Sequence, residues 1–483
     1  MERLLIFERG QSGRRGVRLS RSDADIPREL RRKSLPDLPE VGELDLIRHY
    51  LGLSRLNYSV DSGFYPLGSC TMKYNPKINQ RIAGLSGLMG AHPLWPEEAI
   101  QPVLRILWEM ERLLNEICGM DAFSLQPSAG AQGELAGMLV IQAWHRACGH
   151  RKTTVLIPDS AHGTNPASAS MCGFSVREVT SNDRGMVDLH DLTMKMDDDV
   201  AALMLTNPNT LGVFEEEILE IARIVHDRGG LLYYDGANFN ACLGRCRPGD
   251  MGFDVVHLNL HKSFSTPHGG GGPGAGPVGV KRALERFLPV PRVVEEEGRF
   301  RLIDDRPEAI GKVGTFYGNF GVILRAYTYI RLLGPYGLRK TSEIAVLNAN
   351  YLCNALKTRY HLPFSSQPMH EFVLSAFKQK QSGVSALDIA KRLIDYGFHP
   401  PTIYFPLIVR EAMMIEPTET ETLNTLNAFA DAMVTIRQEV EEHPQLLHHA
   451  PQASPVGRLD EARAARQPVV RWRRPSERTG TLV

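Results

Sequence analysis

Between about residues 100 and 330, short apolar runs alternate with amphipathic segments, and this alternation constrains the fold more than any other feature of the chain. The segment Glu217–Asp227 has apolar residues at helical spacing and is followed by two glycines, which predicts a helix that ends there. Apolar and β-branched residues predict strands at Thr154–Ile157, Val176–Val179, Ala201–Leu205, Leu231–Tyr234, Val255–Leu260 and Val278–Val280. Such alternation is typical of a doubly wound, mostly parallel sheet of the α/β class. A ligand is therefore expected beyond the carboxyl ends of the strands.

Two of these strands deliver ionisable side chains to that edge. Asp235 ends one strand, and Lys262 follows the next apolar run. The segment between them is long enough for a crossover, so the two strands are expected to be parallel neighbours. A neighbouring cation such as His261 or His268, together with burial, would lower the pKa of the lysine amine. The amine could then attack a carbonyl, most commonly that of pyridoxal phosphate, with which it forms a Schiff base. An acid at Asp235 would hold the pyridine nitrogen of that cofactor protonated.

A turn of small residues precedes the predicted helix that includes Ala136 and Ala147. Small residues before a helix expose backbone N–H groups at the positive end of the helix dipole, where a phosphate can bind. The residues expected to form this phosphate loop are Ser128, Ala129, Gly130 and Ala131. Similar turns precede many helices that bind no phosphate, so the prediction of a phosphate site here depends on Asp235 and Lys262 downstream.

Two further strand ends point to the same edge of the sheet. His162 lies in a polar turn after the first strand and could stack on a ring or relay a proton. Thr206 and Asn207 follow the strand Ala201–Leu205 and could donate hydrogen bonds to a ring oxygen or a substrate carboxylate. Each of these residues taken singly also fits a solvated loop. Their assignment to a cofactor site therefore depends on their occurrence together with Asp235 and Lys262.

The glycine-rich run after Lys262 does not indicate a nucleotide site. Its spacing matches the dinucleotide-binding fingerprint, but Pro273 and Pro277 exclude the helix that would hold a pyrophosphate. Lys262 also lacks the preceding glycines of a P-loop. The glycines are expected to allow a flap or a close approach of the backbone to a cofactor.

Composition excludes several classes of partner. Lys plus Arg equals Asp plus Glu at 55 each, so neither nucleic acid nor a membrane surface is an expected partner. Seven scattered cysteines favour a reducing compartment, and Cys242 with Cys246 lacks the second ligand pair of a zinc site, so no metal is expected. The apolar stretch at the start of the sequence is too short for a signal peptide, and no later apolar run could span a bilayer. The cytoplasm is therefore the expected location.

The pattern divides the chain into four parts. We expect an N-terminal arm at residues 1–65, a large α/β domain at 66–334, a smaller C-terminal α+β domain at 335–450 and an exposed tail at 451–483. Within this division, the irregular stretch Arg48–Pro76 follows neither helix nor strand periodicity. So long an irregular segment is usually functional or wraps a partner.

Taken together, these motifs resemble the pyridoxal-phosphate-dependent P-protein family of the glycine cleavage system. The matching segments follow one order along nearly the whole chain, at residues 66–73, 126–134, 160–168, 205–215, 235–238 and 257–276. The resemblance implies a fold of the PLP-dependent transferase-like class (fold type I). By the same resemblance, Lys262 is the Schiff-base lysine that carries pyridoxal 5'-phosphate covalently, Asp235 pairs with the pyridinium, and His162 stacks on the ring. Other implied contacts to the cofactor come from Ser128, Ala129, Gly130, Ala131, Thr206, Ala237 and His261.

The match is closest to the lysine-bearing subunit 2 of the two-subunit form. This implies a subunit 1 in an α2β2 assembly, glycine as substrate, and a lipoylated H-protein that receives the aminomethyl group as CO2 leaves. Gly314 and Thr315 would approach the cofactor across the subunit interface, although residues 316–319 depart from the family pattern. Neither Arg410 nor Lys73 is distinguished as a partner of the substrate carboxylate.

The residues alone leave other activities open. An aminotransferase or a retro-aldol enzyme of the same fold needs the same Lys262 and Asp235. A non-enzymatic scaffold that completes another subunit's site is a third interpretation, and the presence of Lys262 argues against it.

Overall fold

A computed structural model describes residues 4–16, 25–34, 36, 38–270 and 272–471, and divides the chain into the units Met1–Ser62 and Gly63–Val483. The first unit contains η1 (Ile6–Glu8), η2 (Arg28–Leu30) and α1 (Glu43–Ser54). These elements lie in the predicted N-terminal arm, of which residues 1–3, 17–24, 35 and 37 are outside the described part.

The second unit is built on a seven-stranded sheet in the order β1-β7-β6-β5-β4-β2-β3. Neighbouring strands from β2 to β6 pair in parallel, whereas β7 is antiparallel to both β1 and β6. This confirms the predicted mostly parallel sheet and the pairing of the Asp235 strand with the strand before Lys262. The bounds are β1 (Ala122–Ser124), β2 (Thr154–Pro158), β3 (Ser175–Val179), β4 (Val200–Thr206), β5 (Leu231–Gly236), β6 (Val255–Leu258) and β7 (Val278–Val280).

Strand β6 ends two residues earlier than the apolar pattern predicts. Leu258 N still donates to the Pro277 carbonyl, and Leu260 N to the Ala275 carbonyl. Pro277 has no N–H with which to return a ladder bond, so the pairing with the incoming segment is incomplete. Lys262 consequently lies in a turn beyond the strand.

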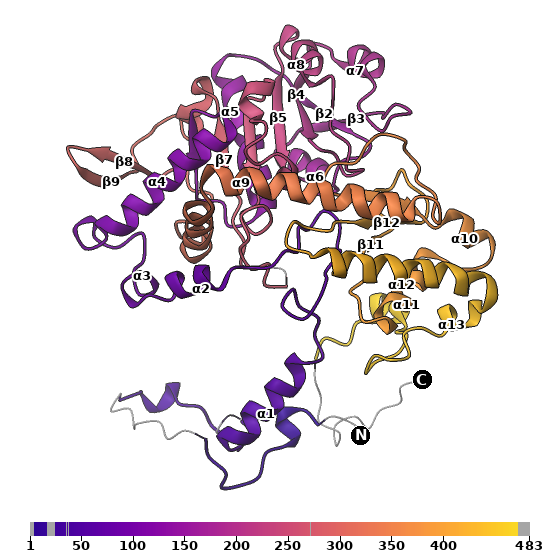
Figure 1. Cartoon of the computed structure of the whole chain (residues 1–483). Helices are drawn as coiled ribbons and strands as arrows, with labels where there is room; N and C mark the ends of the chain where they lie inside the picture. The colour runs from indigo at the N-terminus through magenta and orange to yellow at the C-terminus, as the bar shows by residue number, and fades with distance from the viewer. Residues whose placement is uncertain (1–3, 17–24, 35, 37, 271, 472–483) are drawn as a thin grey trace. The chain divides into compact units, whose positions relative to one another are not determined.

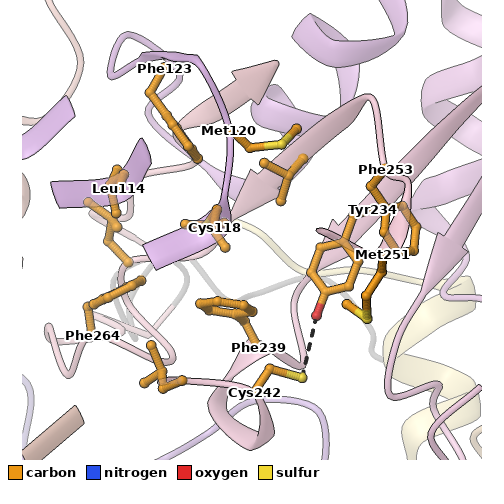
Figure 2. Packing of buried hydrophobic residues seen from close by; sticks show 14 of the residues in the cluster. Leu114, Cys118, Met120, Phe123, Tyr234, Phe239, Cys242, Met251, Phe253 and Phe264 are labelled. Carbon is orange, nitrogen blue, oxygen red and sulfur yellow. Dashed lines mark hydrogen bonds between the residues drawn. The ribbon is translucent and has the colours of Figure 1, made fainter. Parts of the chain in front are cut away.

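Helices cover both faces of the sheet, as Figure 1 shows. On one face, α5 packs against side chains such as Tyr233 and Val255, and on the other, alternate residues such as Tyr234 and Val256 pack with α4, α8 and α9. Figure 2 shows the second core, where Tyr234 lies among Phe239, Phe253 and Cys242. The helices are α4 (Gln101–Cys118), α5 (Gly130–Ala147), α6 (Thr164–Met171), α7 (Leu189–Lys195), α8 (Ile218–Asp227) and α9 (Phe320–Leu356).

Helix α9 connects the large sheet to the C-terminal part of the unit. Gly334 has φ 60° and ψ −175° and Pro335 follows it, so the helix is broken at this point. Residues from Val322 to Ile330 pack in the core of the large sheet, and those from Ala349 to Leu356 pack in a separate C-terminal core. Leu338, beyond the break, still packs in the core of the large sheet, so the division between residues 334 and 335 stays a prediction.

The C-terminal part has a small antiparallel sheet in the order β10-β12-β11, with helices packed on it. Its elements are β10 (Phe372–Ser375), α10 (Phe377–Gln381), α11 (Ala386–Asp395), β11 (Thr402–Ile403), β12 (Ala412–Ile415), α12 (Leu423–Glu442) and α13 (Pro444–His448). In the predicted tail, α14 (Glu461–Arg466) is exposed, and residues 472–483 lie outside the described part. The remaining elements are α2 (Lys77–Ala83), α3 (Ser86–Met89), η3 (Glu97–Ala99), η4 (Phe239–Ala241), η5 (Pro248–Met251), η6 (Arg282–Phe287), β8 (Arg292–Glu296) and β9 (Arg299–Ile303). No helix among the described residues combines the length and apolar character that crossing a bilayer requires.

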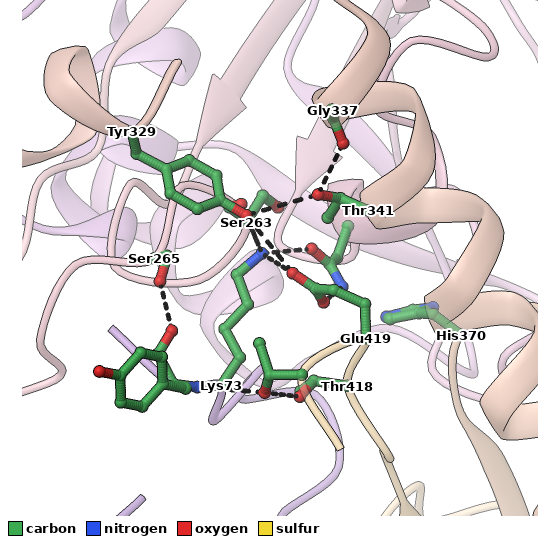
Figure 3. A network of polar contacts seen from close by, with 12 residues as sticks. Lys73, Ser263, Ser265, Tyr329, Gly337, Thr341, His370, Thr418 and Glu419 are labelled. Carbon is green, nitrogen blue, oxygen red and sulfur yellow. Dashed lines mark hydrogen bonds and ion pairs between the residues drawn. The ribbon is translucent and has the colours of Figure 1, made fainter. Parts of the chain in front are cut away.

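Lys73, in the irregular stretch before α2, is buried in a polar network (Figure 3). Its Nζ donates to Glu419 Oε1 at 2.8 Å, Asn240 Oδ1 at 2.9 Å and the Ser263 carbonyl at 2.8 Å. The network links residues far apart in the sequence and fixes the segment just after Lys262. Because its ammonium is fully engaged by protein groups, Lys73 is not available to a substrate carboxylate.

Replacing Lys73 by alanine is expected to lower the free energy of unfolding by about 3–5 kcal/mol, because the Glu419 charge loses its buried partner. Lys195 pairs with Asp191 at a more exposed position, where the side chains are 30% and 23% exposed. Lys195→Ala should therefore cost less than about 1 kcal/mol. Urea unfolding of both variants measures the difference, and equal losses would contradict a buried role for Lys73.

Candidate active site

A cavity of about 200 Å³ opens where strands β4, β5 and β6 end. Side chains that the sequence predicts at the site therefore meet there although they lie far apart along the chain. Of the predicted residues, the cavity is lined by Gly130, Ala131, His162, Thr206, Asp235, Ala237, His261 and Lys262. Ser128 and Ala129 are not among its lining residues and lie just before α5. The structure thus brings the predicted lysine and acid to one cavity.

Asp235 is held in a fixed position by hydrogen bonds. Its Oδ1 accepts from the Ala237 N–H at 2.9 Å and lies 3.3 Å from His257 Nε2, and its Oδ2 accepts from the Thr206 hydroxyl at 3.1 Å. Tyr233 Oη lies 2.9 Å from the other ring nitrogen of His257, which orients that ring. Burial alone would raise the pKa of Asp235, but His257, the Ala237 N–H and Lys262 outweigh it and lower that pKa below its ordinary value. The carboxylate is therefore negatively charged and can hold a proton on a basic ligand atom.

Lys262 is half-buried in the turn after β6. Its backbone N–H donates to the Asn259 carbonyl at 3.0 Å, and its carbonyl accepts from Ser265 N at 3.1 Å. These bonds fix the backbone while leaving the side chain to reach the cavity. The amine thus comes from a rigid turn, not from a loose loop.

The histidines near Lys262 do not supply the neighbouring cation that the sequence suggested. The rings of His261 and His268 are 5.0 Å apart in an edge-on arrangement. Burial, His268 and Lys262 lower the pKa of His261 to about 3, and burial also lowers that of His268. Both rings are consequently neutral near pH 7, which corrects that expectation.

The start of α5 and the glycine-rich segment packed on it require small residues. A Cβ on Gly276 would lie 2.0 Å from the Ala129 carbonyl, and one on Gly130 would lie 2.5 Å from Asn259 Oδ1. The glycine-rich segment therefore packs its backbone directly against the start of α5, the close approach that the glycine run predicts. The Ser128 hydroxyl donates to Gln132 Oε1 at 2.9 Å, so the side chain of Gln132 orients this turn.

His162 lies on the solvent side of the cavity, in the segment between β2 and α6. Its Nδ1 contacts the Thr164 hydroxyl, and its ring meets Phe405 edge-on at 5.5 Å between centroids. These contacts support the ring from one side and leave it at the cavity wall. Asn207, in contrast, accepts from Glu215 N at 3.1 Å and does not line the cavity.

Several lining residues were not predicted, namely Ser69, Glu134, Thr164, Thr210 and Asn259, and neither was the role of His257 behind Asp235. The sequence contained a signal for two of them. His257 interrupts a buried apolar strand, and Glu134 interrupts the apolar face of α5. Buried polar groups of this kind need polar partners, so a polar residue within a buried apolar element indicates a possible site.

Glu134 makes the stability of the cofactor-free chain depend on pH. Burial and the Asp235 charge raise the pKa of Glu134 to about 8 from 4.5. The folded state then binds more protons than the unfolded one, so the free energy of unfolding falls as pH rises from 6 to 8. We expect Glu134→Gln to remove roughly 1 kcal/mol per pH unit from that dependence. Urea unfolding at both pH values measures it, and the exposed Glu217→Gln serves as control; identical slopes in both variants would contradict the prediction.

Comparison with known proteins places the chain among proteins of similar sequence and fold. The family model described as "Glycine dehydrogenase, C-terminal domain" matches residues 341–453, and the model "Aminotransferase class-V" matches residues 131–286. Proteins named probable glycine dehydrogenase (decarboxylating) subunit 2 from Caldanaerobacter subterraneus subsp. tengcongensis and Bacillus licheniformis are each 58% identical over 476 residues, 97% of this chain and 98% of theirs. A crystal structure of glycine decarboxylase (P-protein) of the glycine cleavage system, in inhibitor-bound form, shares the fold with a TM-score of 0.71 and 23% identity, over 85% of this chain and 93% of that one.

Proposed function

This chain belongs to the glycine dehydrogenase (decarboxylating) subunit 2 family, and we propose that it removes the carboxyl group of glycine as CO2 and transfers the remaining aminomethyl group to the lipoyl group of an H-protein. In this reaction a carbon–sulfur bond forms as the lipoyl disulfide breaks, and the released sulfur takes up a proton. The disulfide accepts the electrons, so no other oxidant is required. The observation that carries the proposal is the meeting of Lys262 and Asp235 at one cavity.

The residues of the cavity fit pyridoxal phosphate. Lys262 would hold the cofactor covalently, Asp235 would face its ring nitrogen, and His162 would stack on the ring. When bound, the cofactor withdraws the electron pair that decarboxylation leaves behind. The phosphate would lie at the start of α5, where Gly130 and Ala131 offer backbone N–H groups at the positive end of the helix dipole. The clashes that side chains at Gly130 and Gly276 would cause support this fit, because the cradle exists only with small residues.

The chain's own residues perform the remaining tasks. Thr206 and the Ala237 N–H hold Asp235 so that its charge keeps a proton on the facing nitrogen. The Lys262 amine, when not joined to the cofactor, could accept or return a proton at the reacting atoms. His261 is neutral and lines the same wall, where it can donate one hydrogen bond without adding a charge.

The family implies further partners. The relatives are named subunit 2, and we propose a subunit 1 that joins this chain in an α2β2 assembly, with the lipoylated H-protein as a transient partner. Contacts from Gly314 and Thr315 to the cofactor of a neighbouring subunit are part of this proposal. All seven cysteines are free, which supports a reducing location such as the cytoplasm.

Isotope exchange distinguishes this function from that of an aminotransferase. The aminotransferase is the alternative because the model "Aminotransferase class-V" matches residues 131–286. The chain, its subunit 1 and lipoylated H-protein are incubated with carboxyl-labelled glycine and unlabelled bicarbonate. We expect label to pass from glycine to CO2 only when H-protein is present. Transfer of the amino group to a keto acid without exchange would support an aminotransferase instead.

A further inference from the structure

A buried cluster of two carboxyl groups and an imidazole lies at the edge of the small sheet. His370 and Glu371 come just before β10, and Glu416 comes just after β12. Phe372 pairs with Ile415 in the antiparallel ladder, so the register places Glu371 opposite Glu416. Like charges opposite each other destabilise a strand pair, and both side chains are at most 1% exposed. The fold therefore brings two acids together where water cannot separate their charges.

Part of this cluster already has hydrogen-bond partners in the protein. Glu371 accepts from Ser69 N at 2.6 Å and from Asn238 Nδ2 at 3.0 Å, and Glu416 Oε2 accepts from Thr71 N at 2.7 Å. Ser69 and Thr71 have φ values of 61° and 48°, in the left-handed region that disfavours residues other than glycine. The two carboxyl groups thus hold a constrained loop, and Ser69 of that loop lines the active-site cavity.

The remaining polar atoms of the cluster have no hydrogen-bond partner among the described residues. These atoms are Nδ1 and Nε2 of His370 and Oε1 of Glu416, and both residues are buried. In Figure 3 the His370 ring accordingly carries no dashed line to any residue drawn. His370 Nε2 lies 3.8 Å from Glu416 Oε1, too far for a hydrogen bond. Buried polar atoms in native proteins rarely remain without a partner, so this gap points to a missing ligand.

We propose that His370, Glu371 and Glu416 bind one divalent metal ion, with Zn²⁺ as the ion that fits best. One ligand atom from each of the three side chains lies within 4.8 Å of the others. A separation of 3.8 Å between two of them suits ligands of one ion with bonds of about 2.1 Å. An imidazole with two carboxylates is a set that Zn²⁺ accepts, and three protein ligands leave a fourth position open.

A cation would also explain how two buried acids can be charged side by side. A divalent ion offsets both charges, and it needs the carboxylates deprotonated and the imidazole neutral. The ion would fix the Ser69–Thr71 loop against the small sheet. This proposal differs from the expectation, drawn from the cysteine spacing, that the chain binds no metal.

Metal content tests the site directly. The full chain with its subunit 1 is treated with a chelator, equilibrated with Zn²⁺ or, separately, Mn²⁺, desalted, and measured by inductively coupled plasma mass spectrometry. We expect about one Zn²⁺ per chain, and a rise in melting temperature on adding Zn²⁺. A wild-type protein that retains neither ion would overturn the proposal without any variant being needed.

Variants locate the ion. Glu416→Gln and His370→Gln should each reduce the retained Zn²⁺ at least about tenfold, because each removes one of three ligands. Glu111→Gln is the matched control, since Glu111 is also buried with a pKa raised to about 7 by burial but pairs with Arg292. Cys246→Ser tests the cysteine pair as a rival site. Loss of Zn²⁺ in Cys246→Ser but not in Glu416→Gln would assign the ion elsewhere; circular dichroism confirms that each variant is folded.

Discussion

Lys262→Ala is expected to abolish the visible absorption of bound pyridoxal phosphate and to lower glycine–CO2 exchange at least about 10³-fold. The variant loses the amine that, in the proposed function, holds the cofactor covalently and moves protons at the reacting atoms. Lys262 lies in a turn at the cavity, and its replacement leaves the backbone bonds of that turn unchanged. Absorption spectra and the exchange assay measure the two losses on the same preparation.

Lys281→Ala is the control for this prediction. Lys281 follows β7 of the same sheet and donates to the Gly119 carbonyl at 2.7 Å, away from the cavity lining. We expect its replacement to leave both the absorption band and the exchange rate within about twofold of the wild type. A Lys262→Ala enzyme that keeps the band and the rate would show that another amine holds the cofactor.

Asp235→Asn is expected to lower exchange about 10²–10³-fold while the protein still binds the cofactor. The neutral amide cannot hold a proton on the facing ring nitrogen, so the cofactor withdraws electrons less effectively. The amide also keeps nearly the same shape: its oxygen can still accept from the Ala237 N–H, and its NH2 group can donate to the Thr206 hydroxyl. Measured activity should therefore fall without a comparable loss of stability.

Asp254→Asn is the matched control, because Asp254 lies just before β6 at the opposite end of the strands. Its Oδ2 accepts from Leu232 N at 2.8 Å and lies 2.8 Å from His226 Nε2. This substitution should affect stability and leave the exchange rate nearly unchanged. Equal losses of activity in the two variants would mean that Asp235 acts only as a structural residue.

The large sheet could be predicted from the sequence because most of its strands are fully buried and apolar, β3 at one edge being the exception. The runs that contain Val155, Ala202 and Val255 have no polar face, and the helices between them have a clear period, so the parallel arrangement follows. The end of β6 could not be predicted, because it depends on pairing with Pro277, which comes from a distant segment. The break of α9 at Gly334 and Pro335 is visible in the sequence, but the point along α9 where its side chains pass from one core to the other is not.

Site residues could be predicted where they follow a strand at the carboxyl edge of the parallel sheet, as Asp235 and Lys262 do. Contacts that depend on three-dimensional packing were not. His257 supports Asp235 because β5 and β6 place these residues in register, and Glu134 reaches the same cavity from a helix. The charge state of His261 also depends on burial, which the sequence does not reveal.

Borohydride reduction followed by peptide mass spectrometry tests the central claim most directly. Reduction fixes pyridoxal phosphate to whichever lysine holds it, in the intact protein with its subunit 1. We predict one phosphopyridoxyl group, found on the peptide that contains Lys262, and its absence after Lys262→Ala. A label on any other lysine, or no label in a protein that catalyses the exchange, would contradict the account.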